Sequence, residues 1–338
     1  MIRRPDPSLL DLYDALLLDL DGTLMHGAQP IPHAAEAVEI ARAAGTTVVF
    51  ATNNASRTPQ QAADHLAVVG VAARPEEFVT SPQVASRLLA DRLEAGSKVL
   101  IVGGPSLAAQ IREVGLEPVE TDSEDVVAVV QGWSPDLDWP LLAEGAYAIR
   151  HGAFWMATNI DATLPTERGL APGNGAMVAA LRHATGVEPA VAGKPEPGMF
   201  EVAARDHGAK RPLIIGDRLD TDIEGAVRAG MDSLLVLTGV DGIESALRAE
   251  PVRRPTFILA DLEELAAPFP LPVVDGETAR CGAVRALWRG GDIEVHGEIE
   301  DPRLLRAVLA LLSNHSAEQV WRGVLRDQHG AAVQPTDR

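Results

Sequence analysis

The sequence predicts an α/β fold: a doubly wound, Rossmann-like parallel sheet with an inserted α/β domain and a small C-terminal α+β module. Three observations predict it. Short apolar segments rich in leucine or β-branched residues alternate with alanine-rich helical segments along most of the chain. Glycines follow several of these helices and are expected to end them. A proline-rich break at 268–272 (PFPLP) then separates the last stretch from the rest.

The first stretch contains two strand–helix pairs. Ala15–Leu20 and Thr46–Thr52 are expected to be buried strands, and Ala34–Ala44 and Gln60–Val69 are expected to be the helices that follow them. Such alternation indicates a parallel sheet with covered faces. Later strands are expected at Val99–Val102, Val126–Val130, Ala153–Thr158, Pro212–Gly216, Ser233–Leu237 and Thr256–Leu259. Two further helices are expected at Leu141–His151 and Ala176–Ala184.

The last stretch differs in character. Thr278–Trp288 and Asp292–Gly297 are predicted to form a hairpin across 289–291. Leu304–Leu312 is expected to be a helix with an apolar face, and Ala317–Arg326 a strand or a helix. About seventy residues suffice for a small α+β module, although one of marginal stability alone.

Residues with recognisable chemistry lie only in the outer sections, Asp19 to Asn54 and Lys194 to Asp222. The middle is therefore interpreted as an insertion whose ends return to one parent sheet. The expected domains are a catalytic core at 1–81 and 187–267, an inserted domain that sets specificity at 82–186, and a C-terminal module of unassigned role at 268–338.

Composition and charge restrict the kind of protein. The 338 residues exceed what one core usually holds, so two or three domains are expected. A net charge of −19 argues against nucleic acid or an anionic membrane as the main partner, because both need basic surfaces. The single cysteine, Cys281, excludes an intramolecular disulfide and a zinc–cysteine cluster. With no signal peptide and no apolar run of about 20 residues, a cytoplasmic enzyme is expected.

The segment Asp19-Leu20-Asp21-Gly22-Thr23 directly follows the first expected strand. Two carboxylates on a glycine turn at a strand end can share a magnesium ion and divide the duties of nucleophile and acid. Backbone N–H groups around Gly22 and Thr23 can bind phosphoryl oxygens. Taken alone, the segment is equally typical of an Asp-Gly turn after a strand.

Two more segments place polar residues at strand ends or in loops. Thr52-Asn53-Asn54 can bind a phosphoryl oxygen through a hydroxyl and backbone N–H groups, or can form an Asx turn or helix cap. Lys194, between Gly193 and Pro195, is either the cation that stabilises Asp19 and a phosphoryl group or a solvated surface lysine.

A fourth segment follows the expected strand Pro212–Gly216. Asp217 is the expected magnesium ligand of this loop. Asp222 is expected to orient Lys194 or the loop, with a helix-start aspartate as the alternative. Ligands of open α/β sheets bind at the carboxyl edge, so four such segments in order predict one site at that edge.

These four segments resemble the motifs of the haloacid dehalogenase superfamily, in particular its phosphatase branch. The resemblance implies that Asp19 attacks phosphorus to form an aspartyl-phosphate, and that Asp21 protonates the leaving alkoxide and later accepts a proton from water. It also implies Mg²⁺ as cofactor, bound by the Asp19 carboxylate, the Asp21 carbonyl and Asp217. An acid at position 21 favours phosphoester hydrolysis, because dehalogenases of this superfamily lack one there.

The insertion resembles that of the branch containing para-nitrophenylphosphatase-like, phosphoglycolate and glycerol-3-phosphate phosphatases, in which the inserted domain covers the catalytic edge. By this resemblance, Asn159, Asp161 and Arg168 are candidates for substrate contact. Asn159 and Asp161 can instead shape the turn after a strand, and Arg168 can be a solvated side chain.

The resemblance predicts a phosphatase for a small phosphorylated metabolite. The tail is similar to that of mycobacterial glycerol-3-phosphate phosphatases, which favours glycerol 3-phosphate. Phosphoglycolate, pyridoxal phosphate or another small phosphate are the alternatives, although Leu164 stands where pyridoxal-phosphate phosphatases tend to have histidine. Homodimerisation through the inserted domain is implied by the resemblance alone. The rival of another class is an assembly or binding protein with vestigial activity.

Overall fold

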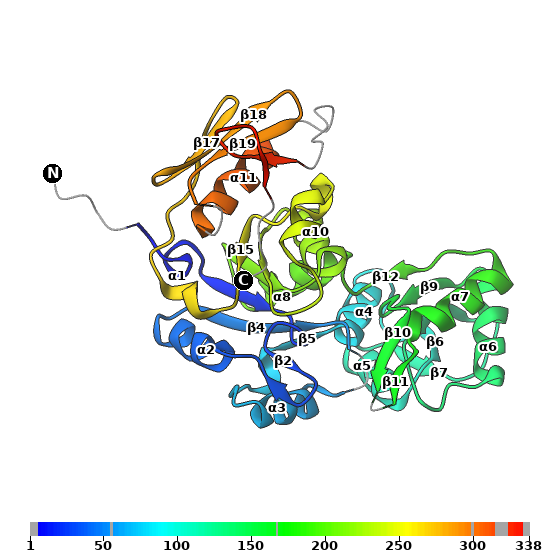
Figure 1. The fold of residues 1–338 in the computed structure, drawn as a ribbon. Helices are drawn as coiled ribbons and strands as arrows, with labels where there is room; N and C mark the ends of the chain where they lie inside the picture. The colour runs from blue at the N-terminus through cyan, green and yellow to red at the C-terminus, as the bar shows by residue number, and fades with distance from the viewer. Residues whose placement is uncertain (1–5, 55–56, 167, 299–300, 315–323, 334–338) are drawn as a thin grey trace. The chain divides into compact units, whose positions relative to one another are not determined.

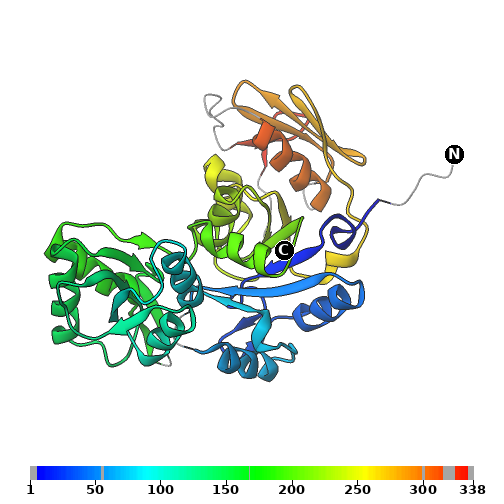
Figure 2. The same ribbon diagram turned by 180° about the vertical axis from the view of Figure 1, so that it is seen from behind.

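The computed structural model describes residues 6–54, 57–166, 168–298, 301–314 and 324–333 (Figures 1 and 2). Its contacts divide the chain into two compact units. The first comprises Met1–Phe50, His65–Ala73 and Ala204–Arg338, and the second comprises Ala51–Asp64 and Arg74–Ala203. Within the described residues, no helix combines the length and the apolar character needed to cross a membrane.

A six-stranded sheet with the order β15–β14–β13–β1–β4–β5 contains the first predicted strands (Figure 1). The pairs β1–β13, β1–β4, β13–β14 and β14–β15 are parallel. The strand β4 continues from the first unit into the second, to which β5 belongs. The strands are β1 (Ala15–Leu18), β4 (Thr47–Thr52), β5 (Phe78–Thr80), β13 (Pro212–Gly216), β14 (Asp232–Val236) and β15 (Phe257–Leu259). The predicted parallel α/β architecture is confirmed.

The order of this sheet creates a topological switch point. β1 lies between β4, which follows it along the chain, and β13, which comes after the whole second unit. Ligands of open α/β sheets bind outside the carboxyl ends of the strands at such a point. The residues that directly follow β1 and β13 therefore occupy the position where the fold favours a site.

Helices α2 (Ala34–Ala43) and α3 (Pro59–Val68) agree with the predicted ones within one residue at each end. A short hairpin that no sequence pattern indicated, β2 (Met25–His26) and β3 (Gln29–Pro30), follows the turn after β1. Helical elements lie between the later strands, as expected: η2 (Leu219–Ile223), α9 (Glu224–Arg228) and α10 (Ile243–Arg248). Elements that were not predicted in this part of the chain are α1 (Leu9–Leu12), η1 (Pro75–Glu77), α8 (Gly198–Asp206), η3 (Pro251–Arg253) and η4 (Glu263–Ala266).

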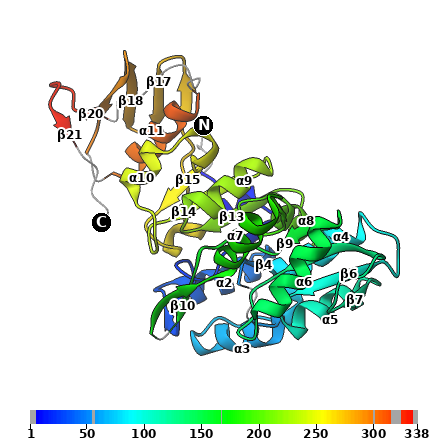
Figure 3. The ribbon, with the colours of Figure 1, turned by 90° about the vertical axis from the view of Figure 1, so that its right-hand side faces the viewer.

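The second unit has a five-stranded parallel sheet with the order β12–β9–β8–β6–β7 (Figure 3). Its buried strands pack against helices through a cluster that includes Leu100, Val129, Trp155 and Leu181. The strands are β6 (Lys98–Val102), β7 (Glu117–Val119), β8 (Val126–Gln131), β9 (Phe154–Ala157) and β12 (Ala190–Val191). The helices are α4 (Ser81–Ala90), α5 (Pro105–Glu113), α6 (Trp139–Arg150) and α7 (Asn174–Thr185), and β10 (Thr163–Thr166) pairs with β11 (Gly169–Pro172).

The C-terminal stretch forms a second six-stranded sheet, in the order β16 to β21, with one long helix, α11 (Pro302–Asn314). The hairpin predicted across 289–291 is present, with Arg289 opposite Asp292. Thr278–Trp288 is not one strand, because a turn at Gly282 (φ +61°) divides it. The strands are β16 (Val273–Asp275), β17 (Thr278–Cys281), β18 (Val284–Arg289), β19 (Asp292–His296), β20 (Leu325–Arg326) and β21 (Ala332–Val333). Most of Ala317–Arg326 lies outside the described residues.

This C-terminal sheet and α11 share one hydrophobic core with the rest of the first unit. Buried side chains of β17–β19 and α11 form a single cluster with Leu219, Ile223 and Leu235 from the parent sheet and the helical turn after β13. The guanidinium of Arg306 on α11 lies 3.5 Å from the centre of the Phe269 ring and donates to Glu264 at 3.1 Å. The apolar face predicted for this helix is therefore buried in a core that the C-terminal sheet shares with the parent sheet and the helical turn after β13.

Candidate active site

The turn after β1 brings Asp19 and Gly22 to the carboxyl edge of the sheet. The N–H of Asp19 donates to the Ile215 carbonyl on β13 at 2.8 Å, so Asp19 is still held in the sheet. The Leu20 carbonyl then accepts from the N–H of Leu24 at 2.8 Å, which closes a tight turn. Gly22 adopts a left-handed conformation (φ +84°) that residues with a side chain rarely take. The predicted Asp-Gly turn is thus present, with both aspartates at its start.

Three glycines allow backbone to approach the buried carboxylates closely. A Cβ atom on Gly22 would lie 2.3 Å from Oδ2 of Asp217, and one on Gly239 would lie 2.0 Å from the same oxygen. A Cβ atom on Gly216 would lie 2.2 Å from Cγ of Asp222. Gly239 lies in the loop after β14 and was not predicted, because a glycine after a strand signals only a turn.

Hydrogen bonds fix this loop to the turn after β1. The N–H of Val240 donates to Asp217 Oδ2 at 2.8 Å, and the N–H of Asp241 donates to the Asp217 carbonyl at 3.1 Å. The hydroxyl of Thr238 donates to the Gly22 carbonyl at 2.6 Å. The loop after β14 therefore orients the Asp217 carboxylate and holds the turn beside it.

The carboxylates of Asp19, Asp217 and Asp222, called the aspartate cluster here, lie together. One oxygen of each lies within 4.8 Å of the others, and Asp217 and Asp222 are each 1% exposed. Carboxylates this close, two of them shielded from water, repel one another unless a cation lies among them. Oxygen ligands of this kind are those that Mg²⁺ prefers. The residues present therefore fit a magnesium ion.

The turn beside the cluster also contains a buried hydroxyl. The Thr23 side chain is fully buried, and within the described residues its Oγ1 has no hydrogen-bond partner. Buried hydroxyls in native proteins nearly always have a partner, and those without one often lie at sites that bind a ligand or water. This observation also fits a turn built to receive a polar group.

Asp21 and Asp222 differ in how they relate to the aspartate cluster. The Asp21 side chain is exposed, and its carboxylate is not part of the cluster. Asp222 accepts a hydrogen bond from the N–H of Arg218 at 3.3 Å, in keeping with the predicted role of orienting the loop. Its carboxylate also lies in the cluster, so Asp222 becomes a candidate metal ligand that the sequence did not assign.

In the second unit, Asn53 holds the backbone of Lys194. The N–H of Lys194 donates to Asn53 Oδ1 at 2.8 Å, and Asn53 Nδ2 donates to the Lys194 carbonyl at 3.0 Å. The Lys194 side chain is 3% exposed, and its Nζ donates to the Ala51 carbonyl at 3.1 Å. The alternative of a solvated surface lysine is therefore wrong. A Cβ on Gly193 would lie 2.5 Å from Asn53 Oδ1, so this contact also requires glycine there.

The other candidates of the second unit surround Asn53. Asn159, 4% exposed, donates from Nδ2 to the Asn53 carbonyl at 2.9 Å, and its Oδ1 accepts from the N–H of Asp161 at 3.2 Å. Asp161 is half-buried, with Oδ1 3.4 Å from Asn53 Nδ2. Asn159 thus does shape the turn after β9, which was the alternative to substrate contact. Arg168 is exposed in the turn between β10 and β11.

Thr52 and Asn54 form the local turn that was the alternative to phosphate binding. The N–H of Asn54 donates to Thr52 Oγ1 at 3.1 Å. As a donor, the Thr52 hydroxyl can still serve a phosphoryl oxygen, because the turn uses only one of its acceptor positions. The local turn and the phosphate role are therefore compatible.

Replacing Asn53 by alanine is expected to lower kcat/KM about 10- to 100-fold, because Lys194 loses both hydrogen bonds that fix its backbone. It should also lower the free energy of unfolding by about 2–4 kcal/mol, since a buried donor and a buried acceptor lose their partner. Ser81→Ala is the matched control: the Ser81 hydroxyl donates to the Asn53 carbonyl, which keeps its bond from Asn159 in that variant. Equal stability and equal kinetics in the two variants would contradict this role of Asn53.

Comparison with known proteins gives matches over most of the chain. Residues 16–117 match the family of haloacid dehalogenase-like hydrolases, and residues 191–265 match a second family described as HAD hydrolase-like. A D-glycerol 3-phosphate phosphatase of Mycobacterium tuberculosis is 45% identical over 328 residues, which cover 95% of this chain and 90% of that protein. The 5'-nucleotidase YutF of Bacillus subtilis is 37% identical over 254 residues, which cover 75% of this chain and 97% of that protein.

Solved structures give corresponding matches. The crystal structure of a glycerol phosphate phosphatase from Mycobacterium tuberculosis in complex with magnesium has a TM-score of 0.82 and 43% identity, with 96% of this chain and 95% of that chain covered. A 4-nitrophenylphosphatase from Thermotoga maritima has a TM-score of 0.69 and 31% identity, with 76% of this chain and 98% of that chain covered. The predicted resemblance is therefore confirmed.

Proposed function

Because this chain belongs to the haloacid dehalogenase-like hydrolases and is a phosphatase that uses Mg²⁺, we propose that it hydrolyses glycerol 3-phosphate to glycerol and phosphate. The aspartate cluster carries the proposal for the reaction. It lies at the topological switch point, where Asp19 follows β1 and Asp217 follows β13. Support for the substrate comes from the relative that matches 95% of this chain, a D-glycerol 3-phosphate phosphatase.

In the proposed first step, a carboxylate oxygen of Asp19 attacks phosphorus and the bond to the alcohol oxygen breaks. Asp21 gives its proton to that oxygen, so glycerol leaves as a neutral alcohol and the phosphoryl group stays on Asp19. The exposure of Asp21 suits this role, because the proton that it gives up is replaced from a water molecule in the second step. Bound Mg²⁺ would be held by the aspartate cluster and the Asp21 carbonyl, and it would neutralise the negative charge that otherwise keeps the Asp19 carboxylate away from the phosphate ester.

In the second step, water attacks the same phosphorus and gives one proton to Asp21, now ionised. The bond between phosphorus and Asp19 breaks, and phosphate leaves. The two steps together consume one water and return both aspartates to their starting protonation states.

We assign binding of the phosphoryl oxygens to Gly22, Thr52, Asn53, Asn54 and Lys194, as the motif resemblance implies. Lys194 suits this role because it is buried, and the Asn53 hydrogen bonds fix its backbone on both sides. For Asn53 the side-chain amide is engaged with Lys194, so its backbone N–H is the group that it would offer to phosphate. Among the cap candidates, Asp161 and Arg168 stay proposals for contact with the glycerol part, whereas the Asn159 amide is used within the protein.

A screen of phosphate release tests the substrate assignment. We expect kcat/KM for glycerol 3-phosphate to exceed that for phosphoglycolate, pyridoxal phosphate and nucleoside monophosphates by at least about tenfold. The measurement is released phosphate against substrate concentration, at saturating Mg²⁺. A higher kcat/KM for any of the other esters would move the assignment to that ester without affecting the aspartyl-phosphate chemistry.

The assembly or binding function receives less support. The apolar residues of the C-terminal sheet and α11 are buried against the rest of the first unit. Burial of these residues therefore does not require another protein. Homodimerisation through the inserted domain and a cytoplasmic location stay predictions, and gel filtration with light scattering would measure the first.

A further inference from the structure

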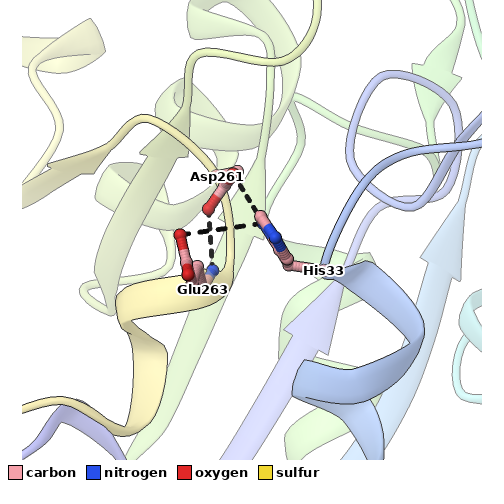
Figure 4. Close-up of side chains that lie close together, drawn as sticks. All are labelled: His33, Asp261 and Glu263. Carbon is pink, nitrogen blue, oxygen red and sulfur yellow. Dashed lines mark hydrogen bonds and ion pairs between the residues drawn. The ribbon is translucent and has the colours of Figure 1, made fainter.

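A second group of side chains that could hold a metal ion lies in the first unit: His33, Asp261 and Glu263, called the His33 cluster (Figure 4). Nδ1 of His33 lies 3.0 Å from Oδ2 of Asp261 and 3.9 Å from Oε2 of Glu263. One ligand atom of each residue lies within 4.8 Å of the others. Figure 4 shows the imidazole pointing from the start of α2 toward the two carboxylates on the segment after β15.

These separations suit a transition-metal ion. An imidazole nitrogen and two carboxylates are ligands typical of Zn²⁺, with bonds of about 2.0–2.2 Å. Two atoms bound at such lengths lie about 3.0–3.5 Å apart, depending on the angle at the metal. The pair His33–Asp261 already meets this condition. Glu263 would have to move by about half an ångström, and its side chain, 70% exposed, has room to do so.

The orientation of the ligands is set in advance. Oδ1 of Asp261 accepts from the N–H of Glu263 at 2.8 Å, which leaves Oδ2 directed toward His33. The imidazole is 39% exposed and the Asp261 carboxylate 25% exposed, so water can reach the group and complete a coordination shell. An entry path, a donor set and an open position are the features that a metal site requires.

The charge around His33 favours a cation. Nδ1 of His33 faces the carboxylates of both Asp261 and Glu263. A doubly charged ion placed between these groups is attracted by both carboxylates. The net charge of −19 adds to this attraction.

We propose that His33, Asp261 and Glu263 bind a divalent transition-metal ion, of the Zn²⁺ class, at a solvent-open site separate from the aspartate cluster. The ion ties the start of α2 to the segment that leads into η4. It also fixes the chain that returns from the catalytic turn, because Ile31, two residues before His33, donates to the Leu24 carbonyl at 3.1 Å. The ion would stabilise the segment between the turn after β1 and the start of α2, and it would not take part in phosphoryl transfer.

The test is titration of the full-length protein with ZnCl₂ by calorimetry, at pH 7.5 with millimolar Mg²⁺ present. Zinc can also enter the aspartate cluster, so the same titration is made on Asp217→Asn. We expect both proteins to bind one zinc ion at the His33 cluster, with a Tm rise of a few degrees. His33→Gly should weaken this binding at least about tenfold. Glycine is chosen because His33 has φ +63°, a conformation that glycine adopts without strain.

Two further variants separate a metal site from an ion pair. Glu263→Gln should weaken zinc binding, although Glu263 is too distant from His33 for a hydrogen bond in the present structure. His183→Ala removes an exposed imidazole on α7 and should bind zinc as the unmodified protein does. Zinc binding to Asp217→Asn that is absent with Mg²⁺ present, or that survives when His33→Gly is combined with Asp217→Asn, would overturn the proposal and leave the His33 cluster as an ion pair only.

Discussion

Asp19→Asn is expected to reduce phosphate release from glycerol 3-phosphate on the order of 10⁴-fold or more, the loss usual when a covalent nucleophile is removed. An amide oxygen is a poor nucleophile, and an amide carries no charge to join the Mg²⁺ ligands. The chain should stay folded, because the N–H of Asp19, which holds the residue in the sheet, is unchanged by the substitution. Steady-state phosphate release and far-UV circular dichroism measure the two parts of this expectation.

For the same variant we expect thermal stability without Mg²⁺ to be maintained or increased, although activity is lost. Without Mg²⁺, the three carboxylates of the aspartate cluster repel one another, and replacing one by an amide relieves this repulsion. In EDTA, the Tm of Asp19→Asn should therefore equal or exceed that of the unmodified protein, whereas Mg²⁺ should raise it less. A destabilising substitution that merely damaged the fold would lower Tm in both conditions.

Asp275→Asn is the matched control, because Asp275 is an exposed aspartate on β16, outside the aspartate cluster. It should keep full activity and the full response to Mg²⁺. The mass of each variant must be checked, since deamidation of the introduced asparagine would restore the aspartate. Substrate labelled in its phosphate group should leave a hydroxylamine-sensitive label on the unmodified protein and none on Asp19→Asn. Substantial turnover by a variant of verified mass would refute the nucleophile assignment.

The sequence predicted the parts of the site that depend on single strands. Asp19 and Asp217 each follow a run of buried apolar residues, and such runs mark central parallel strands. Because the carboxyl ends of parallel strands meet at one edge, two distant aspartates could be placed together without any coordinates. The structure brings Asp222 into the same group, which its position one turn beyond the strand left undecided.

The parts that were not predicted depend on contacts between distant segments. Asn53 was identified for its position after a strand, but its side chain binds the backbone of Lys194, 141 residues away. No local pattern distinguishes an asparagine that binds phosphate from one that holds a loop. Similarly, apolar and polar residues alternate in Thr278–Trp288 on both sides of Gly282. Only the pairing of Cys281 with Val284 in the structure therefore reveals the turn.

The C-terminal stretch shows the same limit at a larger scale. Its apolar helix was expected to pack a small separate module, and Leu304, Val308 and Leu312 do lie in a core. That core also contains Leu219 and Ile223, from the turn that carries Asp222. Apolar periodicity shows which face of a helix is buried but not what it is buried against. The structure thus links this stretch physically to the loop of the aspartate cluster.

Gly239→Ala is the second substitution with a large expected effect, and it tests a residue that the sequence did not single out. The added methyl group would lie 2.0 Å from Asp217 Oδ2, far inside contact distance. Asp217 cannot simply turn away, because it is buried and the neighbouring N–H of Val240 binds the same oxygen. Either the carboxylate leaves the aspartate cluster or the loop moves, and each change disturbs the residues that we propose bind Mg²⁺.

We therefore expect Gly239→Ala to raise the Mg²⁺ concentration for half-maximal activity about 10- to 100-fold, the range seen when groups that orient metal ligands are altered. Gly198→Ala is the matched control, since a Cβ atom there would meet Leu88 at 3.4 Å, an ordinary contact. Its Mg²⁺ dependence and its Tm rise on adding Mg²⁺ should match those of the unmodified protein, whereas the rise should shrink in Gly239→Ala. Gly239→Ala could instead show the same Mg²⁺ concentration for half-maximal activity and the same Tm rise as the unmodified protein. The loop after β14 would then be able to move without cost, and its close approach to Asp217 would not be what orients this carboxylate.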